Sequence, residues 1–464
     1  MTEIKDERSR MLGEEHISKL LVKFSIPAII GMMVTAIYNV VDRIFLGNGV
    51  GQLAIGGVYL NLPIVLSMMA FSMLVGLGGN SIASIRLGQN RKDQAEKILG
   101  TSFSLIILIS VTLSVLLYFN LERLLVLFGA SETILPYAKE YGEILVLFGP
   151  FNMIGFALNN FIRGEGNPKV AMATMFIGAI SNIILDYVFI FIFDMGVKGA
   201  ALATGIGQFL SFLWTIRYFT IGKSLLKIVP KDMKLETYYI KEIISLGITP
   251  FSMQLVFSLV SVGFNHQLQK YGGDLATSSM AIIDSIGQLV FMPIFGINQG
   301  LQPIVGFNYG AKKYRRVQNA LRLSLKYATI YLSLGWLVMM LFPETLVGVF
   351  VKDSASFEAI KPIAVPGLRI YNSMTFMLGF QFVGSGLFQS IGKARVGFIL
   401  SMTRQLIFLM PLLFILPIFL NINGIWTAMA VSDLLSTLVT TYFLIKSNFL
   451  THNFEKDGEF VVGI

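Results

Sequence analysis

The 464-residue chain is far more apolar than a soluble protein, since 54% of its residues are hydrophobic, 14% are charged and the mean hydropathy is +0.70. Soluble globular domains carry roughly 25% charged residues, so this composition excludes a string of soluble domains and indicates a polytopic membrane protein. Cysteine is absent, which excludes disulfides and thiolate metal sites. The net charge of +9 shows an excess of basic residues, whose positions along the chain have to be explained.

The chain begins with a charged segment, "MTEIKDERSRMLGEEH", that lacks the apolar core of a signal peptide and predicts a retained head over 1–19. Apolar stretches follow along the whole length, each long enough for a helix to cross roughly 30 Å of hydrocarbon. Weak period-two alternation argues against an outer-membrane barrel. We predict an all-α polytopic fold of about twelve transmembrane helices. The predicted spans are 20–46, 57–85, 101–119, 141–162, 170–193, 199–221, 240–268, 276–304, 320–342, 363–389, 397–420 and 424–445.

The distribution of basic residues predicts the orientation. With the amino terminus inside, most of the 36 Lys and Arg fall in segments on the cytoplasmic side, as the positive-inside rule requires, so both termini are expected in the cytoplasm of a cell-membrane protein. This topology accounts for basic loops such as "AKKYRR" at 311–316 without a nucleic-acid partner. Membrane lipid and small molecules are the expected partners, and no feature indicates an obligatory protein partner.

An internal repeat divides the chain. The segment "RLGQNRKDQAEKILGTSFSL" at 86–105 resembles "NYGAKKYRRVQNALRLSLKY" at 308–327, and Pro27 matches Pro250 near the same offset of about 222 residues. Each half holds an even number of predicted spans, so the halves are parallel repeats with a cleft expected between two lobes. The predicted parts are a cytoplasmic head at 1–19, an N-lobe at 20–221, a linker at 222–240, a C-lobe at 241–446 and a cytoplasmic tail at 447–464.

Acidic residues inside the apolar spans are the candidate functional residues, because burying a charge in hydrocarbon costs at least about 2.5 kcal/mol. In "SNIILDYVFIFIFD", Asn182 and Asp186 are four residues apart and share a helix face. Asp42 and Thr204 lie at similar predicted depth. Two carboxylates, an amide oxygen and a hydroxyl could bind a hard cation such as Na⁺ or share a proton. The alternative is an interfacial role for Asp42 and a packing network around Asp186.

Three further charges lie in spans of the second half, namely Asp284, Arg404 and Asp433. They could line a substrate cavity that attracts cations, or Arg404 could form a structural pair with one of the aspartates; the sequence favours neither. Pro27 and Pro250 each remove a helical hydrogen bond, which allows either a bending point or a static kink.

Five segments carry a resemblance to a known family, namely "FSIPAIIGMMVTAIYNVVDRIFLG", "RLGQNRKDQA", "NNFIRGEGNPKVAM", "SNIILDYVFIF" and "GVKGAALAT". Together they resemble the multidrug and toxic compound extrusion family, particularly its DinF-like and MepA-like bacterial branches. The resemblance implies V-shaped lobes, alternating access and export of amphipathic, often cationic compounds in exchange for H⁺ or Na⁺. It also implies a cation or proton site at Asp42, Asn182, Asp186 and Thr204, and a bending point at Pro27.

The sequence departs from the NorM-like pattern, in which the seventh helix supplies an acidic residue to a second ion site. Here the outer part of that span, 240–268, offers only Asn265, His266 and glutamines. We predict a secondary multidrug antiporter without enzymatic activity or a cofactor other than its coupling ion. "IGKS" at 221–224 is no P-loop, because the required first glycine is replaced by Arg217. The alternatives are a lipid-linked oligosaccharide flippase of the same superfamily, which needs a basic cavity, and a channel, which lacks obligatory exchange.

Overall fold

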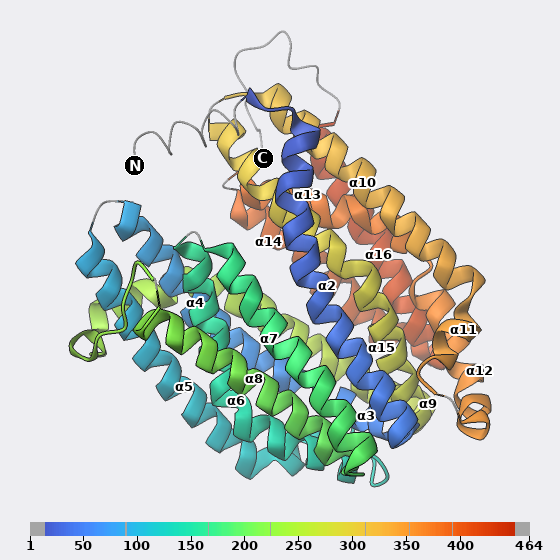
Figure 1. The fold of residues 1–464 in the computed structure, drawn as a ribbon. Helices are drawn as coiled ribbons and strands as arrows, with labels where there is room; N and C mark the ends of the chain where they lie inside the picture. Colours follow the sequence, from blue (N-terminus) through green and yellow to red (C-terminus); the bar gives the residue numbers. More distant parts are fainter. Residues whose placement is uncertain are drawn as a thin grey trace. The chain divides into compact units, whose positions relative to one another are not determined.

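The computed structural model describes residues 14–88, 91–165, 167–222, 224–310, 312–351, 353–391 and 393–450. Within these ranges the regular elements are helices (Figure 1). Most of the predicted head and tail, 1–13 and 451–464, lies outside the described residues.

The helices of the first half follow the predicted spans, with one division. A break at Asn61 separates α3 from α4, where the Asn61 amide donates to the carbonyl oxygens of Gly57 at 3.1 Å and Ala138 at 2.9 Å. The elements are α2 (Ile17–Gly49), α3 (Gln52–Leu60), α4 (Leu62–Gly88), α5 (Lys92–Leu127), α6 (Leu135–Gly164), α7 (Pro168–Asp186), the π-helical η1 (Tyr187–Ile192) and α8 (Gly196–Thr220).

The second half begins after a short 3₁₀ turn and contains one very long helical element, α9. It also contains a second π-helical segment, η4. The elements are η2 (Pro230–Asp232), α9 (Thr237–Gly310), α10 (Tyr314–Leu341), α11 (Pro343–Gly348), α12 (Ser354–Tyr371), η3 (Thr375–Met377), α13 (Leu378–Ser390), α14 (Ala394–Met402), η4 (Thr403–Leu409), α15 (Met410–Leu420) and α16 (Ile422–Lys446).

The described residues contain ten helices that are long and apolar enough to cross a membrane, against about twelve predicted spans. Two differences explain the count. The stretch Pro250–Gly306 covers most of the seventh predicted span and all of the eighth. The two are separated at Gly273 by a backbone conformation (φ 63°, ψ −158°) that only glycine adopts readily. The predicted span 363–389 is interrupted by η3, and its first part, α12, carries two prolines and several charged residues.

The helices pack into two compact units that cut the chain at different places from the sequence repeat. Both α2 and α9 are shared, because the division falls after Ile37 in α2 and after Ile282 in α9. Over their described residues, the amino-terminal unit comprises Tyr38–Ile282 and Gly348–Lys361, and the carboxy-terminal unit comprises Met1–Ile37, Ile283–Val347 and Pro362–Ile464.

Within the carboxy-terminal unit, the amino-terminal part of α2 packs closely on the second part of α9. A Cβ added to Gly296 would lie 2.7 Å from the Cα of Ile29, and one added to Gly300 would lie 2.7 Å from the backbone nitrogen of Ser25. These glycines, one helical turn apart, allow backbone contact of the kind that small residues permit in membranes.

The amino-terminal unit contains the equivalent contact, in which the first helix of the second half packs on the second helix of the first half. A Cβ at Gly78 of α4 would collide with the carbonyl oxygen of Ile243 in α9, and Gly247 meets the backbone of Leu74 in the same way. Leu74 and Gly78 precede Gly296 and Gly300 by the repeat offset of about 222 residues. The first helix of each half therefore packs on the second helix of the other half.

Each unit has its own apolar core. In the amino-terminal unit, buried residues such as Val75, Ile98 and Val146 bring α4, α5 and α6 together. In the carboxy-terminal unit, Leu20 of α2 packs in a cluster with Leu321 of α10 and Phe388 of α13.

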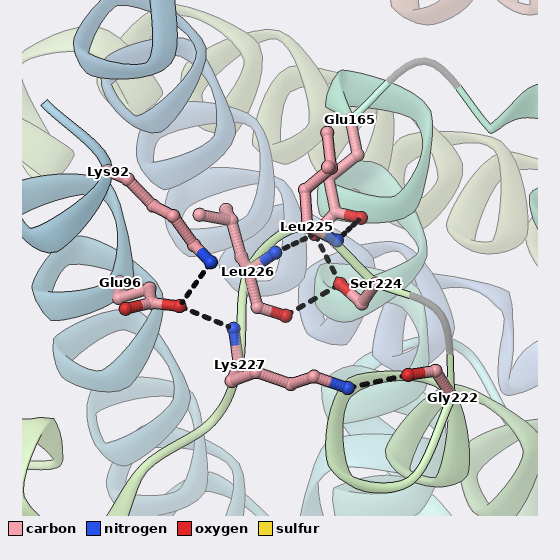
Figure 2. A network of polar contacts seen from close by, with 8 residues as sticks. All are labelled: Lys92, Glu96, Glu165, Gly222, Ser224, Leu225, Leu226 and Lys227. Atoms are coloured by element: carbon pink, nitrogen blue, oxygen red, sulfur yellow. Dashed lines mark hydrogen bonds and ion pairs between the residues drawn. The ribbon is translucent and has the colours of Figure 1, made fainter. Parts of the chain in front are cut away.

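The predicted linker is fixed to the amino-terminal unit by Glu165, just after α6 (Figure 2). Its carboxylate accepts hydrogen bonds from the Ser224 hydroxyl at 2.5 Å and from the backbone nitrogens of Leu225 and Leu226, each at 3.1 Å. The Tyr218 hydroxyl donates to the same group at 2.9 Å. One carboxylate thus holds a turn of otherwise irregular backbone.

A second set of contacts continues along α5. The backbone nitrogen of Lys227 donates to Glu96 at 3.2 Å, and Lys92 is 3.6 Å from the same carboxylate (Figure 2). Further on, the Ser104 hydroxyl donates to the carbonyl oxygen of Met233 at 2.7 Å. The linker is thus a bound strap on the amino-terminal unit.

Candidate cation site and a second charged centre

The helix α7 presents Asn182 and Asp186 toward α8. The Nδ2 of Asn182 donates a hydrogen bond to the Thr204 hydroxyl at 3.2 Å. Asn182 and Asp186 are buried, with 2% and 0% of their surfaces exposed. The four-residue spacing places both side chains on one helix face, and the small residue Gly207 lets α8 approach Asn182 closely.

Asp42, in the carboxy-terminal part of α2, completes the group. It is 6% exposed, and its carboxyl group lies within interaction range of that of Asp186. The Asn182 side chain lies near the Asp186 carboxyl group, although no hydrogen bond joins them among the described residues. The structure therefore brings together the four residues that the sequence indicated, from α2, α7 and α8.

Several oxygens in this group have no hydrogen-bond partner among the described residues. They are Oδ1 of Asp42, both carboxylate oxygens of Asp186 and Oδ1 of Asn182. All are acceptors once the acids are ionised, and a buried acceptor without a partner is costly. Such a set can be satisfied by a proton or by a hard cation such as Na⁺, which prefers oxygen ligands. The described residues hold no cluster of three or more His, Asp or Glu that could bind a metal ion.

Two tyrosines belong to the same site and were not indicated by the sequence. The phenol of Tyr141, on α6, lies within hydrogen-bonding range of the Thr204 side chain and near both aspartates. Tyr38 lies one helical turn before Asp42 and near its carboxyl group. The Tyr38 spacing could have been noticed on α2, whereas Tyr141 is brought in by tertiary packing alone.

The guanidinium of Arg43 is buried beside the site, with 9% of the residue exposed. Its Nη1 donates to the carbonyl oxygen of Ala281 in α9 at 2.9 Å. Because Arg43 follows Asp42 directly, its positive charge acts on that carboxylate.

The helix changes its winding directly after Asp186, where the π-helical η1 begins. Wide turns of this kind are rare and occur frequently at functional sites. The segment ends at Phe193, whose nitrogen donates to the Val188 carbonyl oxygen, five residues earlier, at 3.0 Å. Asp186 thus lies at a junction between two helical geometries.

The carboxy-terminal unit contains a second buried charged centre. The Nε of Arg404 donates to Oδ1 of Asp433 at 2.6 Å, and the two side chains are 8% and 3% exposed. The guanidinium lies 5.3 Å from the centre of the Phe382 ring. The Ser432 hydroxyl donates to the Arg404 carbonyl oxygen at 2.6 Å, which satisfies backbone in the π-helical η4.

Asp284 lies in the same unit and is half-buried. Its Oδ2 accepts a hydrogen bond from Gln288 at 2.8 Å. The Tyr371 phenol lies within electrostatic range of all three charged groups, Asp284, Arg404 and Asp433. The three charges proposed from the sequence are therefore near one another, with Arg404 bonded to Asp433.

The other residues singled out in the sequence lie away from the two charged centres described above. Asn265 is fully buried, while Nε2 of His266 donates to the carbonyl oxygen of Leu127 at 2.7 Å, since a carbonyl can only accept. Pro27 lies inside α2, which continues through it. The acidic residue of the seventh predicted span, Glu242, lies near the start of that span and pairs with Arg86 of α4 at 3.1 Å.

This fold repeats a set of membrane-spanning helices and buries ionisable groups among them. Both features are typical of membrane transporters. A family profile described as MatE matches residues 27–188 and 250–415, one match in each half, and the chain belongs to this family. The predicted membership and all-α multi-pass fold are thus confirmed.

Relatives match nearly the whole chain. The multidrug export protein MepA of Staphylococcus aureus is 27% identical over 95% of this chain and 97% of its own length. The MATE multidrug transporter DinF-BH, solved as a complex with a small molecule, is 39% identical, covers 95% of this chain and 98% of its own, and has a TM-score of 0.78. An inward-facing MATE family transporter of the MOP superfamily, 24% identical over 91% of this chain and 97% of its own, shares the fold with a TM-score of 0.84.

Proposed function

We propose that the protein is a secondary multidrug exporter of the cell membrane, exchanging amphipathic, often cationic compounds for H⁺ or Na⁺ by alternating access. Support comes from MepA, a multidrug export protein, and from DinF-BH, a multidrug transporter solved with a small molecule bound. Transporters of this fold are known in both inward-facing and outward-facing conformations. Both termini lie in the cytoplasm in this proposal, as the basic residues predict.

The observation that supports the coupling is that oxygens of Asp42, Asp186 and Asn182 have no hydrogen-bond partner in the part of the chain that the structure describes. Binding of a cation or proton removes the cost of leaving these acceptors unsatisfied. A ligand shifts a conformational equilibrium only by its difference in affinity for the two states. Cation binding from outside therefore drives drug release if the site is complete in one conformation and disrupted in the other.

Each residue has a role in this proposal. Asp42 and Asp186 supply the negative charge, while Asn182 contributes its amide oxygen because its Nδ2 is engaged by Thr204. Thr204 is a positioning residue that fixes the orientation of that amide. Pro27 is the proposed bending point of α2, where a missing hydrogen bond lowers the cost of bending.

We propose two different roles for the buried charges of the carboxy-terminal unit. The 2.6 Å bond between Arg404 and Asp433 supports a pair that joins η4 to α16, and the half-buried Asp284 is the acid proposed to face a cationic substrate. A flippase for a pyrophosphate-linked lipid needs basic groups for its headgroup. The engagement of Arg404 by Asp433 therefore favours drug export.

Efflux of a fluorescent cationic dye from proteoliposomes, under separately imposed proton and Na⁺ gradients, tests the function. We expect one gradient to drive transport by the wild type and Asp186→Asn to lose it. Asp353→Asn is a matched control, because it makes the same change at an exposed residue before α12. Coupled transport that persists undiminished in a folded Asp186→Asn variant would return Asp186 to a structural role.

A further inference from the structure

We propose that α10 carries a binding site for one anionic phospholipid, whose phosphate group lies between Arg322 and Lys326. The site belongs to the carboxy-terminal unit. It uses no residue of the two charged centres and requires no drug export. It gives a ligand to two exposed cations inside a membrane-spanning helix that neither centre employs.

The start of α10 is a strongly basic part of the chain. Six Lys and Arg fall within 312–326, while the longer stretch 285–343 contains no Asp or Glu. The matching part of α5, about 222 residues earlier, is mixed in charge. There Asp93 stands at the position that Arg315 takes in α10, and Glu96 follows three residues later. The two halves therefore share this helix but differ in its charge, and only α10 presents cations without acids beside them in sequence.

Arg322 and Lys326 are four residues apart, so their exposed side chains lie on one face of α10. Nη2 of Arg322 donates to the carbonyl oxygen of Leu450, just after α16, at 3.0 Å. This bond positions the guanidinium, but the carbonyl brings no formal negative charge, and a guanidinium has five N–H donors. Among the described residues, no carboxylate forms an ion pair with either side chain. Like charges at this spacing repel each other, and an anion placed between them reverses that effect.

The position of the two cations in the membrane indicates the kind of anion. Both lie beyond the first two turns of α10 and inside the ninth predicted span. The same face continues with apolar side chains, since Ile330 is 50% exposed and Leu337 is 45% exposed, whereas Leu321 on the opposite face is buried. Long cationic side chains near the end of a span extend their charged groups toward the lipid phosphates. One stripe of α10 thus offers cations to a phosphate and an apolar surface to acyl chains.

Two other anions fit this stripe less well. A free phosphate ion gains nothing from the apolar part. The chain's own tail carries three acids within 455–459. However, Lys326 lies one turn farther into the span than Arg322, which is bonded to Leu450. A polar tail that neutralised Lys326 would have to enter the hydrocarbon, where unpaired backbone groups are costly. An anionic phospholipid carries its charge at the correct depth and continues into apolar chains.

Thermal unfolding of the full chain in detergent tests the site, because a ligand that binds the folded protein raises its unfolding temperature. The probes are dioleoyl phosphatidylglycerol, which is anionic, dioleoyl phosphatidylcholine, which has no net charge, and glycerol phosphate, which is a headgroup without acyl chains. Arg322→Gln/Lys326→Gln removes both charges, and Arg322→Lys/Lys326→Arg retains them. The matched control is Lys97→Gln/Lys169→Gln, which removes two exposed cations near the starts of α5 and α7 in the amino-terminal unit.

At saturating lipid, we expect phosphatidylglycerol to raise the unfolding temperature of the wild type by about 2 to 4 °C more than phosphatidylcholine does. The charge-retaining variant and the matched control should show the same difference, and the charge-free variant should show none. An equal response of the wild type to both lipids would overturn the assignment. So would a difference that persists in the charge-free variant or disappears in the matched control. Glycerol phosphate that matched the effect of phosphatidylglycerol would show a site for free anions and not for a lipid.

Two further variants complete the test. If the charge-free double variant does not fold, Lys326→Gln alone is judged by the same criterion, because its side chain has no hydrogen bond among the described residues. Glu455→Gln/Asp457→Asn/Glu459→Gln removes the acids of the tail and should leave the lipid response of the wild type unchanged. A response to phosphatidylglycerol that appeared only in this tail variant would mean that the tail neutralises the two cations, and would overturn the lipid site.

Discussion

The two buried charged centres of this transporter differ in what they leave unsatisfied. In the carboxy-terminal unit, Arg404 and Asp433 satisfy one another at 2.6 Å. In the amino-terminal unit, Asp42 and Asp186 have like charges and carry oxygens without a partner among the described residues. A balanced pair mainly joins helices, whereas an unbalanced pair needs a ligand. The difference indicates which centre can respond to a gradient.

The surroundings of the two centres are otherwise similar. The π-helical η1 follows Asp186, and the π-helical η4 contains Arg404. Both segments lie in the fifth predicted span of their half. The halves thus retained a local irregularity while the charges beside it diverged.

Removing one acid of the unbalanced pair is expected to have the largest effect. Asp186→Asn deletes a negative charge and an acceptor from the cation site, so we expect gradient-driven dye export to fall at least about tenfold, the loss of roughly 1.4 kcal/mol or more of coupling free energy. Initial efflux rates measure this. Thermal stability in detergent should be retained or increased, because like-charge repulsion is removed; a large loss of stability would place the effect on folding.

Breaking the balanced pair should instead reduce stability. Arg404→Met leaves the Asp433 carboxylate buried without its partner and is expected to cost about 3 to 5 kcal/mol. The double variant Arg404→Met/Asp433→Leu should recover much of this loss, because no isolated charge remains. Unfolding of the single and double variants tests the pair. A single variant as stable as the wild type, but with altered coupling, would reverse the roles of the two centres.

A substitution in the contacts that hold the linker, away from both charged centres, is expected to have a smaller effect. Glu165→Gln weakens charge-assisted hydrogen bonds from Ser224, Leu225 and Leu226, so we expect proteolysis of the strap to accelerate by roughly tenfold. Limited digestion of the detergent-solubilised protein measures it. The cation-to-dye ratio should not change, and a shift in that ratio would show that the strap influences the cation site.

The exposed Asp353 is expected to give the smallest effect. The Ser356 backbone amide donates to its carboxylate at 2.8 Å and lowers the pKa of Asp353 below its usual value. A lowered folded pKa means that the stabilisation is present at neutral pH and is lost as the pH falls below the ordinary Asp pKa and through the lowered one. Amide exchange in the first turn of α12 should follow this dependence in the wild type and not in Asp353→Asn. Dye export by the variant at pH 7 should match the wild type.

The sequence was sufficient for features that depend on local pattern. Apolar length predicted most spans, and the spacing of Asn182 and Asp186 predicted a shared helix face. Tyr141 was not predictable, because its place beside Thr204 depends on how α6 packs against α8. The interruption at η3 was missed because apolar residues dominate 363–389, and of the two α12 prolines only Pro366 lies inside that predicted span. The fixed linker depends on Glu165, which is distant in sequence and has no local pattern.

The exchange of first helices between the units affects biosynthesis. Ser25 and Ile29 are made early, but the glycines against which they pack, Gly296 and Gly300, emerge only after more than half of the chain has been translated. At about 5 to 20 residues per second, this delay is roughly a quarter of a minute to a minute. The first helix must therefore wait in the bilayer without its final neighbour. A ribosome that stalls before α9 would release a fragment whose leading helix has no native partner, so neither half of this protein is a self-sufficient folding unit.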